Sequence, residues 1–516
     1  MRLLGLACLG FLASLASAAE TKRPNIIMIV ADDMGFSDLG CYGGEIRTPN
    51  IDRLFSDGLR LTQFYNCAVC NVTRATMLTG LNPRFGTGSL LQNNMVTIAE
   101  VLQQAGYATV LSGKWHLGGF PTRPIDRGFQ EFYGVMIGAV NHFDPSLPDP
   151  PPYKHAGPPN PFVHNATPIK SVPADYYDTD AFVDHAVQQI RNLSKGDKPY
   201  FLHVAFTAPH YPMQAPKEDI ARYKDRYREG YSVFRERRYR RLIELNLISS
   251  SWKLPPPDQK LGDWRYDLEP PPWDALPDKD WESAKMEVYA AMVDRMDQGV
   301  GRIMAELKSS GADANTLVIF FSDNGGCASN STEAAYQSFK EGKPVGDKDS
   351  YILCGPGWAT VQSSPFRRYK TWTYEGGIST PMILRWPGHI APRTNTSMVG
   401  HVVDLMPTLL DVAGVKYPSR FKGRDILPME GISLKPYILG DARLGDRELG
   451  WALYGSRAYR SGKWKAVWGV TAKRWELYDI EADRTETHDL AAAEPAIVKK
   501  LSAKWLTWAK RSGAPR

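Results

Sequence analysis

The residues best placed to do chemistry form a segment that begins at a cysteine. It reads Cys70-Asn-Val-Thr-Arg74-Ala-Thr-Met-Leu-Thr79-Gly80, so the cysteine stands four positions before an arginine at the expected start of a helix. Helix N-termini stabilise anions, and a thiol at such a position is biased toward reactivity. The segment therefore predicts a reactive residue, Cys70, with a cation, Arg74, near it.

The elements that must position this segment are short strands and longer helices in alternation. Helical patterns include a segment capped by Thr97 and ended by Gly106, and a longer helix over 283–308. The alternation predicts an α/β fold, in which helices sandwich a large mixed sheet that is mostly parallel. Five apolar runs, rich in β-branched residues, are predicted to be buried parallel strands: Ile26–Val30, Thr109–Leu111, Phe201–Phe206, Leu317–Phe321 and Met382–Leu384.

Four of these strands lead into polar groups, and ligand sites in open α/β sheets lie at the carboxyl ends of strands. We therefore expect the groups to meet at one edge of the sheet. Each alone is also typical of a turn, a helix cap or a structural histidine. The strands lead, in chain order, into Asp32-Asp33, Lys114-Trp-His116, His210 and Asp323-Asn324.

The acidic members of this set indicate a metal site. Three carboxylates and one amide offer oxygen donors, which suit a hard cation, Ca²⁺ or Mg²⁺, rather than zinc. No His/Cys cluster has the spacing of a zinc site. The basic and protonatable members, together with Arg74, are suited to surround an anion. Lys370 lies before the predicted strand at 382–384 and is a further candidate for this site. The alternative is that it is an ordinary surface lysine.

The ends of the chain differ from its centre. The chain has 516 residues with 43% hydrophobic content. Residues 1–18 are predicted to be a Sec-type signal peptide, so we expect a periplasmic or extracellular protein without a membrane span. Residues 19–440 are predicted to form the catalytic domain, with irregular insertions at about 145–173 and 253–281. Residues 441–516 are predicted to form a small α+β subdomain of antiparallel strands and one helix.

Cysteine content and charge allow two further predictions. After removal of Cys8 the remaining cysteines are odd in number, and use of Cys70 in catalysis would leave four. Cys327 with Cys354 is the preferred disulfide, because both flank one polar insertion, and free thiols are the alternative. The segment Arg222–Arg241 holds nine Lys/Arg against three Asp/Glu. It is predicted to be a solvated, partly helical surface with local ion pairs, and the alternative is a contact surface for a sulfated polyanion. Nucleic acid is not an expected partner, and the sequence does not indicate an oligomeric state.

Seven motifs in the same order resemble the formylglycine sulfatases of the alkaline-phosphatase superfamily, in the style of secreted bacterial members. The resemblance covers Pro24 to about Gly414. It departs from the family signature Cys-x-Pro-Ser-Arg at Val72 and Thr73. The motifs are PNIIMIVADD, the Cys70 signature, GKWHLG, the Ala-Pro-His segment, SDNGG, KTWTYEGGISTP and VVDLMPTLLDVAG.

This resemblance implies a mechanism. A formylglycine-generating enzyme would oxidise Cys70, and the hydrate of the aldehyde would attack sulfate esters of a small molecule or glycan. Lys114 and Lys370 would hold the sulfate oxygens, His210, with Lys370, would protonate the leaving alcohol, and His116 would deprotonate the second hydroxyl so that sulfate is expelled. By the same resemblance, the ligands of one Ca²⁺ would be Asp32, Asp33, residue 70, Asp323 and Asn324.

Alternatives remain open. The same fold serves phosphodiesterases and phosphonate monoester hydrolases, and an unconverted Cys70 would leave a non-catalytic binder of sulfated glycans. Asn141 and His142 are candidates for contact with the substrate, with loop residues of no consequence as the alternative. The sequence does not name the sugar or the sulfated position.

Overall fold

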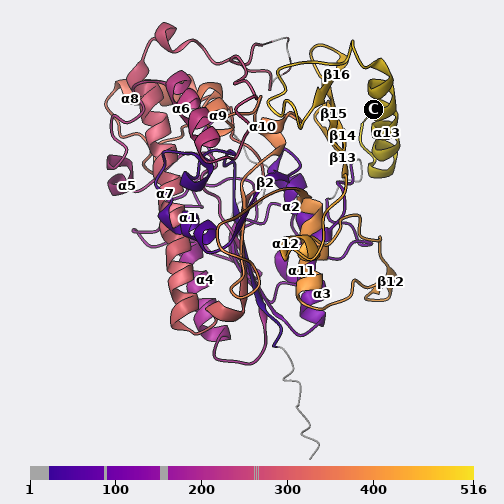
Figure 1. Cartoon of the computed structure of the whole chain (residues 1–516). Coiled ribbons are helices and arrows are strands. Elements are labelled where there is room, and N and C mark those ends of the chain that lie inside the picture. Colours follow the sequence, from indigo (N-terminus) through magenta and orange to yellow (C-terminus); the bar gives the residue numbers. More distant parts are fainter. Residues whose placement is uncertain are drawn as a thin grey trace, which may run out of the picture.

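The computed structural model describes residues 22–85, 90–151, 161–260, 262, 264 and 266–515, so the predicted signal peptide lies outside the described residues. A sheet of ten strands, in the order β10-β2-β9-β8-β1-β7-β3-β4-β5-β6, forms the centre, and helices cover both of its faces (Figure 1). The strands are β1 (Asn25–Ala31), β2 (Leu59–Tyr65), β3 (Ala108–Gly113), β4 (Glu131–Val135), β5 (Phe162–His164), β6 (Thr167–Pro168), β7 (Tyr200–Ala205), β8 (Thr316–Ser322), β9 (Met382–Arg385) and β10 (Thr394–His401).

The five predicted strands all form, and the predicted mixed, mostly parallel sheet is confirmed. The central strand β1 pairs in parallel with both β7 and β8. The prediction of parallel pairing is wrong for the run at 382–384, because β9 is antiparallel to both β2 and β8. An apolar run indicates burial on both faces, but it carries no information on strand direction.

The two faces of β1 supply two separate hydrophobic cores. Ile26, Met28 and Val30 pack into one core, and Ile27 and Ile29 pack into the other. All five side chains are fully buried. Successive side chains of a strand point to opposite faces, so a continuous apolar run is what a strand between two helix layers requires.

Helices α1, α4 and α7 lie on one face of the sheet, and α2, α3 and α11 lie on the other (Figure 1). The predicted cap at Thr97 is confirmed, because its side chain accepts a hydrogen bond from the Glu100 backbone N–H in a capping box. The helices are α1 (Pro49–Ser56), α2 (Cys70–Thr79), α3 (Ile98–Gln104), α4 (Asp178–Leu193), α5 (Lys217–Ala221), α6 (Tyr231–Glu244), α7 (Lys279–Ser309), α8 (Glu333–Lys340), α9 (Pro356–Gln362), α10 (Glu375–Ile378), α11 (Leu405–Val412), α12 (Lys435–Ile438) and α13 (Pro495–Ser512).

The long helix α7 begins four residues before the predicted start at residue 283. Asp278 is its N-cap, and the side chain accepts a hydrogen bond from the Trp281 backbone N–H. This cap satisfies a free N–H of the first turn and makes the earlier start favourable. Within the described residues, no helix is long and apolar enough to cross a membrane.

The two insertions are partly ordered. The first, at 145–173, was predicted to be irregular, but it contains the short antiparallel pair β5 and β6, which extends the sheet beyond β4. The second, at 253–281, is largely irregular. Its tryptophans attach it to the main body, since Trp264 packs edge-on against Trp372 at 4.4 Å between ring centroids and Trp281 is buried.

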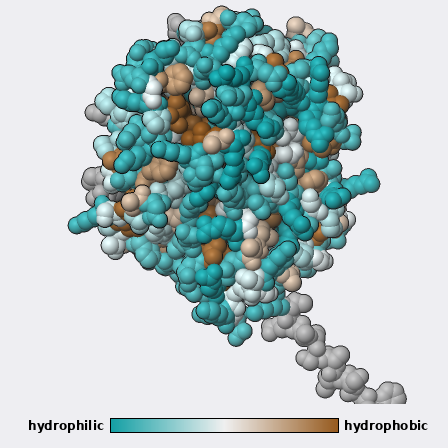
Figure 2. Space-filling model, turned by 90° about the vertical axis from the view of Figure 1, so that its left-hand side faces the viewer, coloured by the Kyte–Doolittle hydropathy of each residue, from teal (hydrophilic) through white to brown (hydrophobic). Residues whose placement is uncertain are grey.

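The basic segment Arg222–Arg241 is a helical surface with local ion pairs, as predicted. Arg237 pairs with Glu229 and Arg240 with Glu236, and these four side chains are largely exposed. Figure 2 shows that the face near α5 and α8 is mostly hydrophilic, with a small hydrophobic hollow. Arg238 differs from the rest, because it is buried and its guanidinium binds Asp38 and Glu45. Much of the basic charge is therefore already paired within the protein.

A second sheet follows Gly440. It consists of β13 (Glu448–Leu453), β14 (Ser456–Ser461), β15 (Trp464–Gly469) and β16 (Arg474–Asp479), all antiparallel, and α13 packs on one of its faces. The short pair β11 (Arg420–Phe421) and β12 (Arg424–Asp425) forms a separate ribbon. The predicted antiparallel sheet with one helix is thus confirmed, while the domain limits at 18/19 and 440/441 stay predictions.

A buried group of charges joins the second sheet to the main body. Lys465 of β15 binds both Glu375 of α10 and Glu486, at 2.8 and 2.9 Å, and none of the three side chains is exposed to solvent. Arg484 also binds Glu375, at 2.7 Å. Burial of ionised groups is tolerated only where each is paired and hydrogen-bonded, and this network meets that condition.

The preferred disulfide is wrong. Cys327 and Cys354 are both free thiols, as are Cys41, Cys67 and Cys70. Cys354 lies in the core, where its Sγ accepts a hydrogen bond from the Gln362 amide at 3.0 Å, whereas Cys327 lies at the wall of the cavity described below. Sequence spacing alone does not bring two cysteine Cβ atoms to bonding distance.

Candidate active site

The ends of β1 and β8 bring four oxygen-bearing side chains together. The two strands are paired in parallel with Ala31 opposite Ser322, so the residues that follow them, Asp32-Asp33 and Asp323-Asn324, emerge side by side. The Asp33 backbone N–H donates to Asp323 Oδ1 at 3.3 Å, and the Asn324 Nδ2 donates to Asp33 Oδ1 at 2.6 Å. All four side chains are buried.

Three oxygens of this group lack a hydrogen-bond donor. Asp32 Oδ1, Asp33 Oδ2 and Asn324 Oδ1 are buried acceptors without a partner. Buried polar atoms are normally satisfied, and an exception at a cluster of carboxylates indicates an ion that belongs there. The donor set is all oxygen, so it fits a hard divalent cation such as Ca²⁺ or Mg²⁺.

Cations balance the three carboxylates. Arg74 Nε and Nη2 bind Asp323 Oδ2 at 3.0 and 2.8 Å, and Lys114 Nζ forms an ion pair with Asp32 Oδ2. Lys370 Nζ binds Asp33 Oδ1 at 2.6 Å. Three positive and three negative side chains thus sum to zero, and a bound divalent cation would make the site net positive and ready for an anion.

The carboxylates differ in their proton affinity. Burial acts to raise the pKa of Asp32, but the charges of Lys114 and Arg74 outweigh it, so the pKa of that carboxyl lies well below its ordinary value. Burial and the charge of Asp32 raise the pKa of Asp323 to about 7. In the metal-free protein, one of the neighbouring carboxyls therefore holds a proton more readily than the others.

Cys70 is the first residue of α2, and it lies in the same buried pocket. Its side chain is 3% exposed, and its Sγ is 3.3 Å from Nδ1 of His116. Burial raises the pKa of the Cys70 thiol above its ordinary value, despite the nearby Lys114 and Lys370. The unmodified thiol is therefore less acidic than a free cysteine, because desolvation outweighs the nearby lysines, and the reactivity of residue 70 stays a prediction.

Val72 occupies its place without strain. It is buried in the first turn of α2, and its backbone N–H donates to the side chain of Asn71 at 2.9 Å rather than to a helix carbonyl. Proline lacks this N–H, and the first turn of a helix is where such a loss is tolerated. The backbone at this position therefore suits either residue.

Two histidines flank Cys70 and the carboxylates. Burial, together with Lys114 and Arg74, lowers the pKa of His116 well below its ordinary value, and burial together with Lys370 does the same for His210. His210 Nδ1 is 2.6 Å from the Tyr211 carbonyl oxygen, and its Nε2 is 3.4 Å from Asp33 Oδ2. Both rings are therefore neutral in the protein without substrate, and each keeps a nitrogen directed toward the site.

The structure does not bring Asn141 and His142 to the cavity wall. His142 is 1% exposed, binds Asp178 at 2.9 Å through Nδ1, and has Nε2 3.2 Å from the His210 carbonyl oxygen. Asn141 bonds the Lys348 carbonyl and caps the backbone that follows it. Neither residue lines the cavity above Cys70, and His142 lies behind His210 and supports its backbone, while contact of either with a substrate stays a prediction.

A cavity of about 500 Å³ opens above Cys70. Part of its wall comes from the second insertion, and another part comes from the β13–β14 turn, which sequence reasoning missed because that turn carries no motif. Tyr266 and Tyr454 stack with their ring centroids 5.2 Å apart and an interplanar angle of 19°. The cavity is lined by Cys70, His116, His210 and Lys370 at its base, and by Tyr211, Tyr266, Leu268, Cys327, Tyr369 and Tyr454 around them.

The strand ends bring together oxygen ligands for a cation, two lysines and an arginine suited to an anion, and two histidines. This combination defines a hydrolase of anionic esters of the alkaline-phosphatase type. The family model described as Sulfatase matches residues 24–415. The chain therefore belongs to the sulfatase family, and it is a sulfuric ester hydrolase.

Curated relatives agree with this assignment. An uncharacterized sulfatase of Schizosaccharomyces pombe is 36% identical over 96% of this chain and 95% of its own length. The arylsulfatase of Klebsiella aerogenes is 36% identical over 82% of this chain and 94% of its own length. Human arylsulfatase A is 28% identical and covers 95% of this chain and 84% of its own length.

Solved structures share the fold. Ps i-CgsB, crystallised with k-i-k-neocarrahexaose, superposes with a TM-score of 0.66 at 25% identity, covering 94% of this chain and 93% of that one. BT4656, solved with its substrate D-glucosamine-2-N,6-O-disulfate, superposes with a TM-score of 0.62 at 20% identity, covering 95% of this chain and 98% of that one. The second likeness concerns the fold alone.

Proposed function

We propose that the protein hydrolyses sulfate monoesters on carbohydrates through a formylglycine made from Cys70 and one bound Ca²⁺. The observation that carries this proposal is the meeting of Cys70 with three partnerless buried oxygens, from Asp32, Asp33 and Asn324. A thiol with a raised pKa is a poor nucleophile, so a chemical change at residue 70 is what gives the site its reactivity. Sulfatases as a family use a formylglycine and a divalent metal.

The cation would be held by Asp32, Asp33, Asp323 and Asn324, next to residue 70. When bound, it would neutralise the carboxylates and lower the pKa of a coordinated hydroxyl. The buried set of protein oxygens favours Ca²⁺ over Mg²⁺, because Mg²⁺ usually keeps several waters and demands a small octahedral site.

The basic side chains of the site have separate tasks. Lys114 and Lys370 reach the carboxylates from the sides of β3 and of the loop before α10, and they would hold the sulfate oxygens as the S–O bond to the leaving group breaks. Arg74 Nε donates to Asp323 Oδ2 at 3.0 Å and Nη1 donates to the Lys114 carbonyl at 3.0 Å, while Nη2 lies 2.8 Å from Asp323 and 3.8 Å from Asp32. Its task is therefore to hold the carboxylates in place beside residue 70, and direct contact with sulfate is left to the lysines.

The two histidines would move protons at opposite ends of the reaction. His116 Nδ1 is 3.3 Å from Cys70 Sγ, within reach of a proton on residue 70, and its lowered pKa keeps the ring unprotonated and able to accept that proton. His210 Nε2 faces Asp33 and the cavity, so it can pass a proton to the leaving oxygen once the bound anion raises its pKa.

The cavity wall supports a carbohydrate or aryl group on the sulfate. The stacked pair Tyr266 and Tyr454 offers a flat apolar surface of the kind on which sugar rings and aryl groups pack, and Tyr454 is 50% exposed. We further propose that the protein is exported, as its first residues predict.

Parallel assays on p-nitrophenyl sulfate and p-nitrophenyl phosphate esters test the reaction class, and a panel of sulfated mono- and oligosaccharides tests the substrate. We expect higher kcat/KM on the sulfate ester and release of sulfate from at least one sugar. Higher kcat/KM on a phosphate mono- or diester would support the phosphoryl-transfer alternative. Absence of turnover with retained binding of sulfated glycan would support the non-catalytic one.

A further inference from the structure

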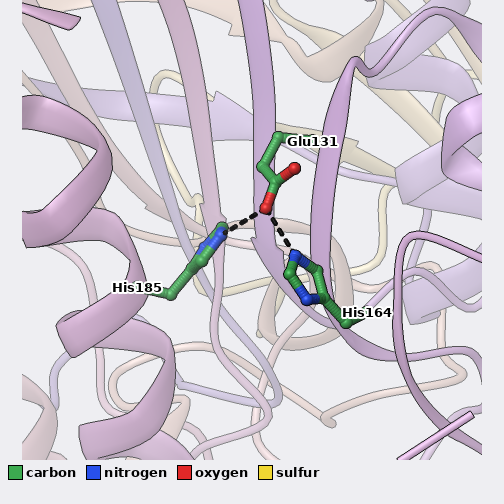
Figure 3. A group of neighbouring side chains, drawn as sticks. All are labelled: Glu131, His164 and His185. Carbon is green, nitrogen blue, oxygen red and sulfur yellow. Dashed lines mark hydrogen bonds and ion pairs between the residues drawn. The ribbon is translucent and has the colours of Figure 1, made fainter. Parts of the chain in front are cut away.

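A second cluster of potential metal ligands lies away from the active site, at the outer edge of the sheet. Glu131 comes from β4, His164 from β5 and His185 from α4, and their side chains converge (Figure 3). One ligand atom from each lies within 4.8 Å of the other two. None of the three lines the cavity above Cys70. The cluster is therefore separate from the proposed Ca²⁺ site.

The distances suit a small tetrahedral ion. Zinc binds histidine nitrogen and carboxylate oxygen at about 2.0–2.2 Å, which places tetrahedral ligand atoms about 3.3 Å from one another. His185 Nε2 is already 3.3 Å from Glu131 Oε1. His164 Nε2 is 2.6 Å from the same oxygen, so it must withdraw by a fraction of an ångström. Its side chain is 52% exposed and lies at the end of a short strand, so this shift is unhindered.

The ring of His185 is held with one nitrogen directed at the cluster. Ser112 Oγ donates to the Phe182 carbonyl oxygen at 2.7 Å, so its single proton is used there. It must then accept from His185 Nδ1, which lies at 3.1 Å. In the neutral ring the lone pair is consequently on Nε2, and it faces the Glu131 carboxylate. The Gln189 side-chain Nε2 also lies near this nitrogen, but at 3.4 Å it is a long and weak donor. A cation between His185 Nε2 and the Glu131 carboxylate would satisfy both acceptors.

The other two ligands are also oriented. Asn165 Nδ2 donates to Glu131 Oε2 at 3.1 Å, which leaves Oε1 to face both histidines. The Asn165 Oδ1 accepts from the Phe132 backbone N–H at 2.8 Å and anchors the hairpin to β4. The Tyr133 ring stacks on His185 at 5.2 Å between centroids. Such outer hydrogen bonds and packing are what fix the ligands of a metal site.

We propose that Glu131, His164 and His185 form a structural site for Zn²⁺, with water as the fourth ligand, that clasps the β5–β6 hairpin and α4 to β4. Two imidazoles and one carboxylate are the donors that zinc prefers, in contrast to the all-oxygen set at Asp32 and Asp33. The exposed side of His164 leaves a path for the ion and room for the water.

The test is calorimetric titration of the full-length protein with ZnCl₂ in saturating Ca²⁺, which occupies the proposed active-site cradle. We expect one zinc per chain at this cluster. His164→Gln should weaken the binding by at least about 100-fold, since it removes a ligand. Ser112→Ala should weaken it by about 10-fold, in the range for loss of an outer hydrogen bond. The matched control, His488→Gln, changes another exposed histidine and should bind zinc as the wild type does.

Two further readouts separate this site from the catalytic one. Zinc should raise the Tm of the wild type and of His488→Gln but not that of His164→Gln, because only a ligand that binds the folded protein stabilises it. The Co²⁺ derivative should show the visible absorption of a tetrahedral ion, and His164→Gln should abolish it. Zinc binding of equal affinity in the wild type and in His164→Gln, or no binding in the wild type, would overturn the proposal.

Discussion

The buried network between the two sheets gives the sharpest prediction on stability. Lys465 contacts two carboxylates, Glu375 at 2.8 Å and Glu486 at 2.9 Å, and all three side chains are 0% exposed. In the variant Lys465→Met, Glu375 keeps Arg484, but Glu486 loses its ion pair with Lys465. At a pH above about 7 the Glu486 carboxyl is ionised in the wild type, and removal of one partner from a buried pair then leaves an uncompensated charge and costs about 3–5 kcal/mol. We expect the free energy of unfolding to fall by that amount.

A matched control lies two residues away on the same hairpin. Lys463 pairs with Asp479 at 2.6 Å, but its side chain is 45% exposed, and an exposed pair contributes at most about 1 kcal/mol. Lys463→Met should therefore leave the urea midpoint almost unchanged, while Lys465→Met shifts it strongly with a similar m-value. Urea unfolding followed by tryptophan fluorescence measures both. Equal midpoints for the two variants would refute the reasoning that burial, and not the mere presence of an ion pair, gives this network its weight.

Three other perturbations follow from the structure. Lys370→Met should lower kcat for sulfate-ester hydrolysis by about 10²–10³-fold, which is the effect of removing one group that stabilises developing charge. Lys343→Met, on the exposed surface, should leave kcat unchanged. An unchanged kcat in Lys370→Met would exclude Lys370 from the chemistry. Removal of divalent metal with a chelator should lower the activity on sulfate esters, and Ca²⁺ should restore it, because the bound cation activates a coordinated hydroxyl. Recovery of activity with Zn²⁺ but not with Ca²⁺ would contradict a metal site built from oxygen ligands. Burial, opposed by Lys465 and reinforced by Glu375, raises the pKa of Glu486 from 4.5 to about 7. Its contribution to the free energy of unfolding is therefore complete below pH 4.5 and is lost as the pH rises through about 7. Between these two pH values the urea midpoint of Glu486→Gln should fall less than that of the wild type, and identical pH profiles would refute the raised pKa.

The sequence was most informative where one residue pattern permits one structure. A run such as Ile26–Val30 is apolar at every position, and it forms a strand whose two faces enter two cores. Because parallel strands end at the same edge, the polar residues after β1 and β8 could be expected to meet, and their oxygens do meet. The predicted catalytic and metal-binding residues are thus gathered at one place, although their chemical roles stay proposals.

Features that depend on depth or direction could not be predicted. Strand β9 runs antiparallel, and an apolar run does not encode that choice. His142 was a candidate for contact with the substrate, yet its side chain is buried behind His210. The raised pKa of the Cys70 thiol depends on how completely the site is desolvated, which no local pattern reports. Glu131, His164 and His185 come from three separate elements, so no spacing in the sequence indicates that they converge.

The central claim is that residue 70 becomes the nucleophile after oxidation of its thiol. Mass spectrometry of the peptide that carries residue 70, from protein produced together with a formylglycine-generating enzyme, tests it most directly. The account predicts the mass of an aldehyde in place of the thiol, in proportion to the specific activity on p-nitrophenyl sulfate across preparations. An unmodified Cys70 in fully active protein would contradict it.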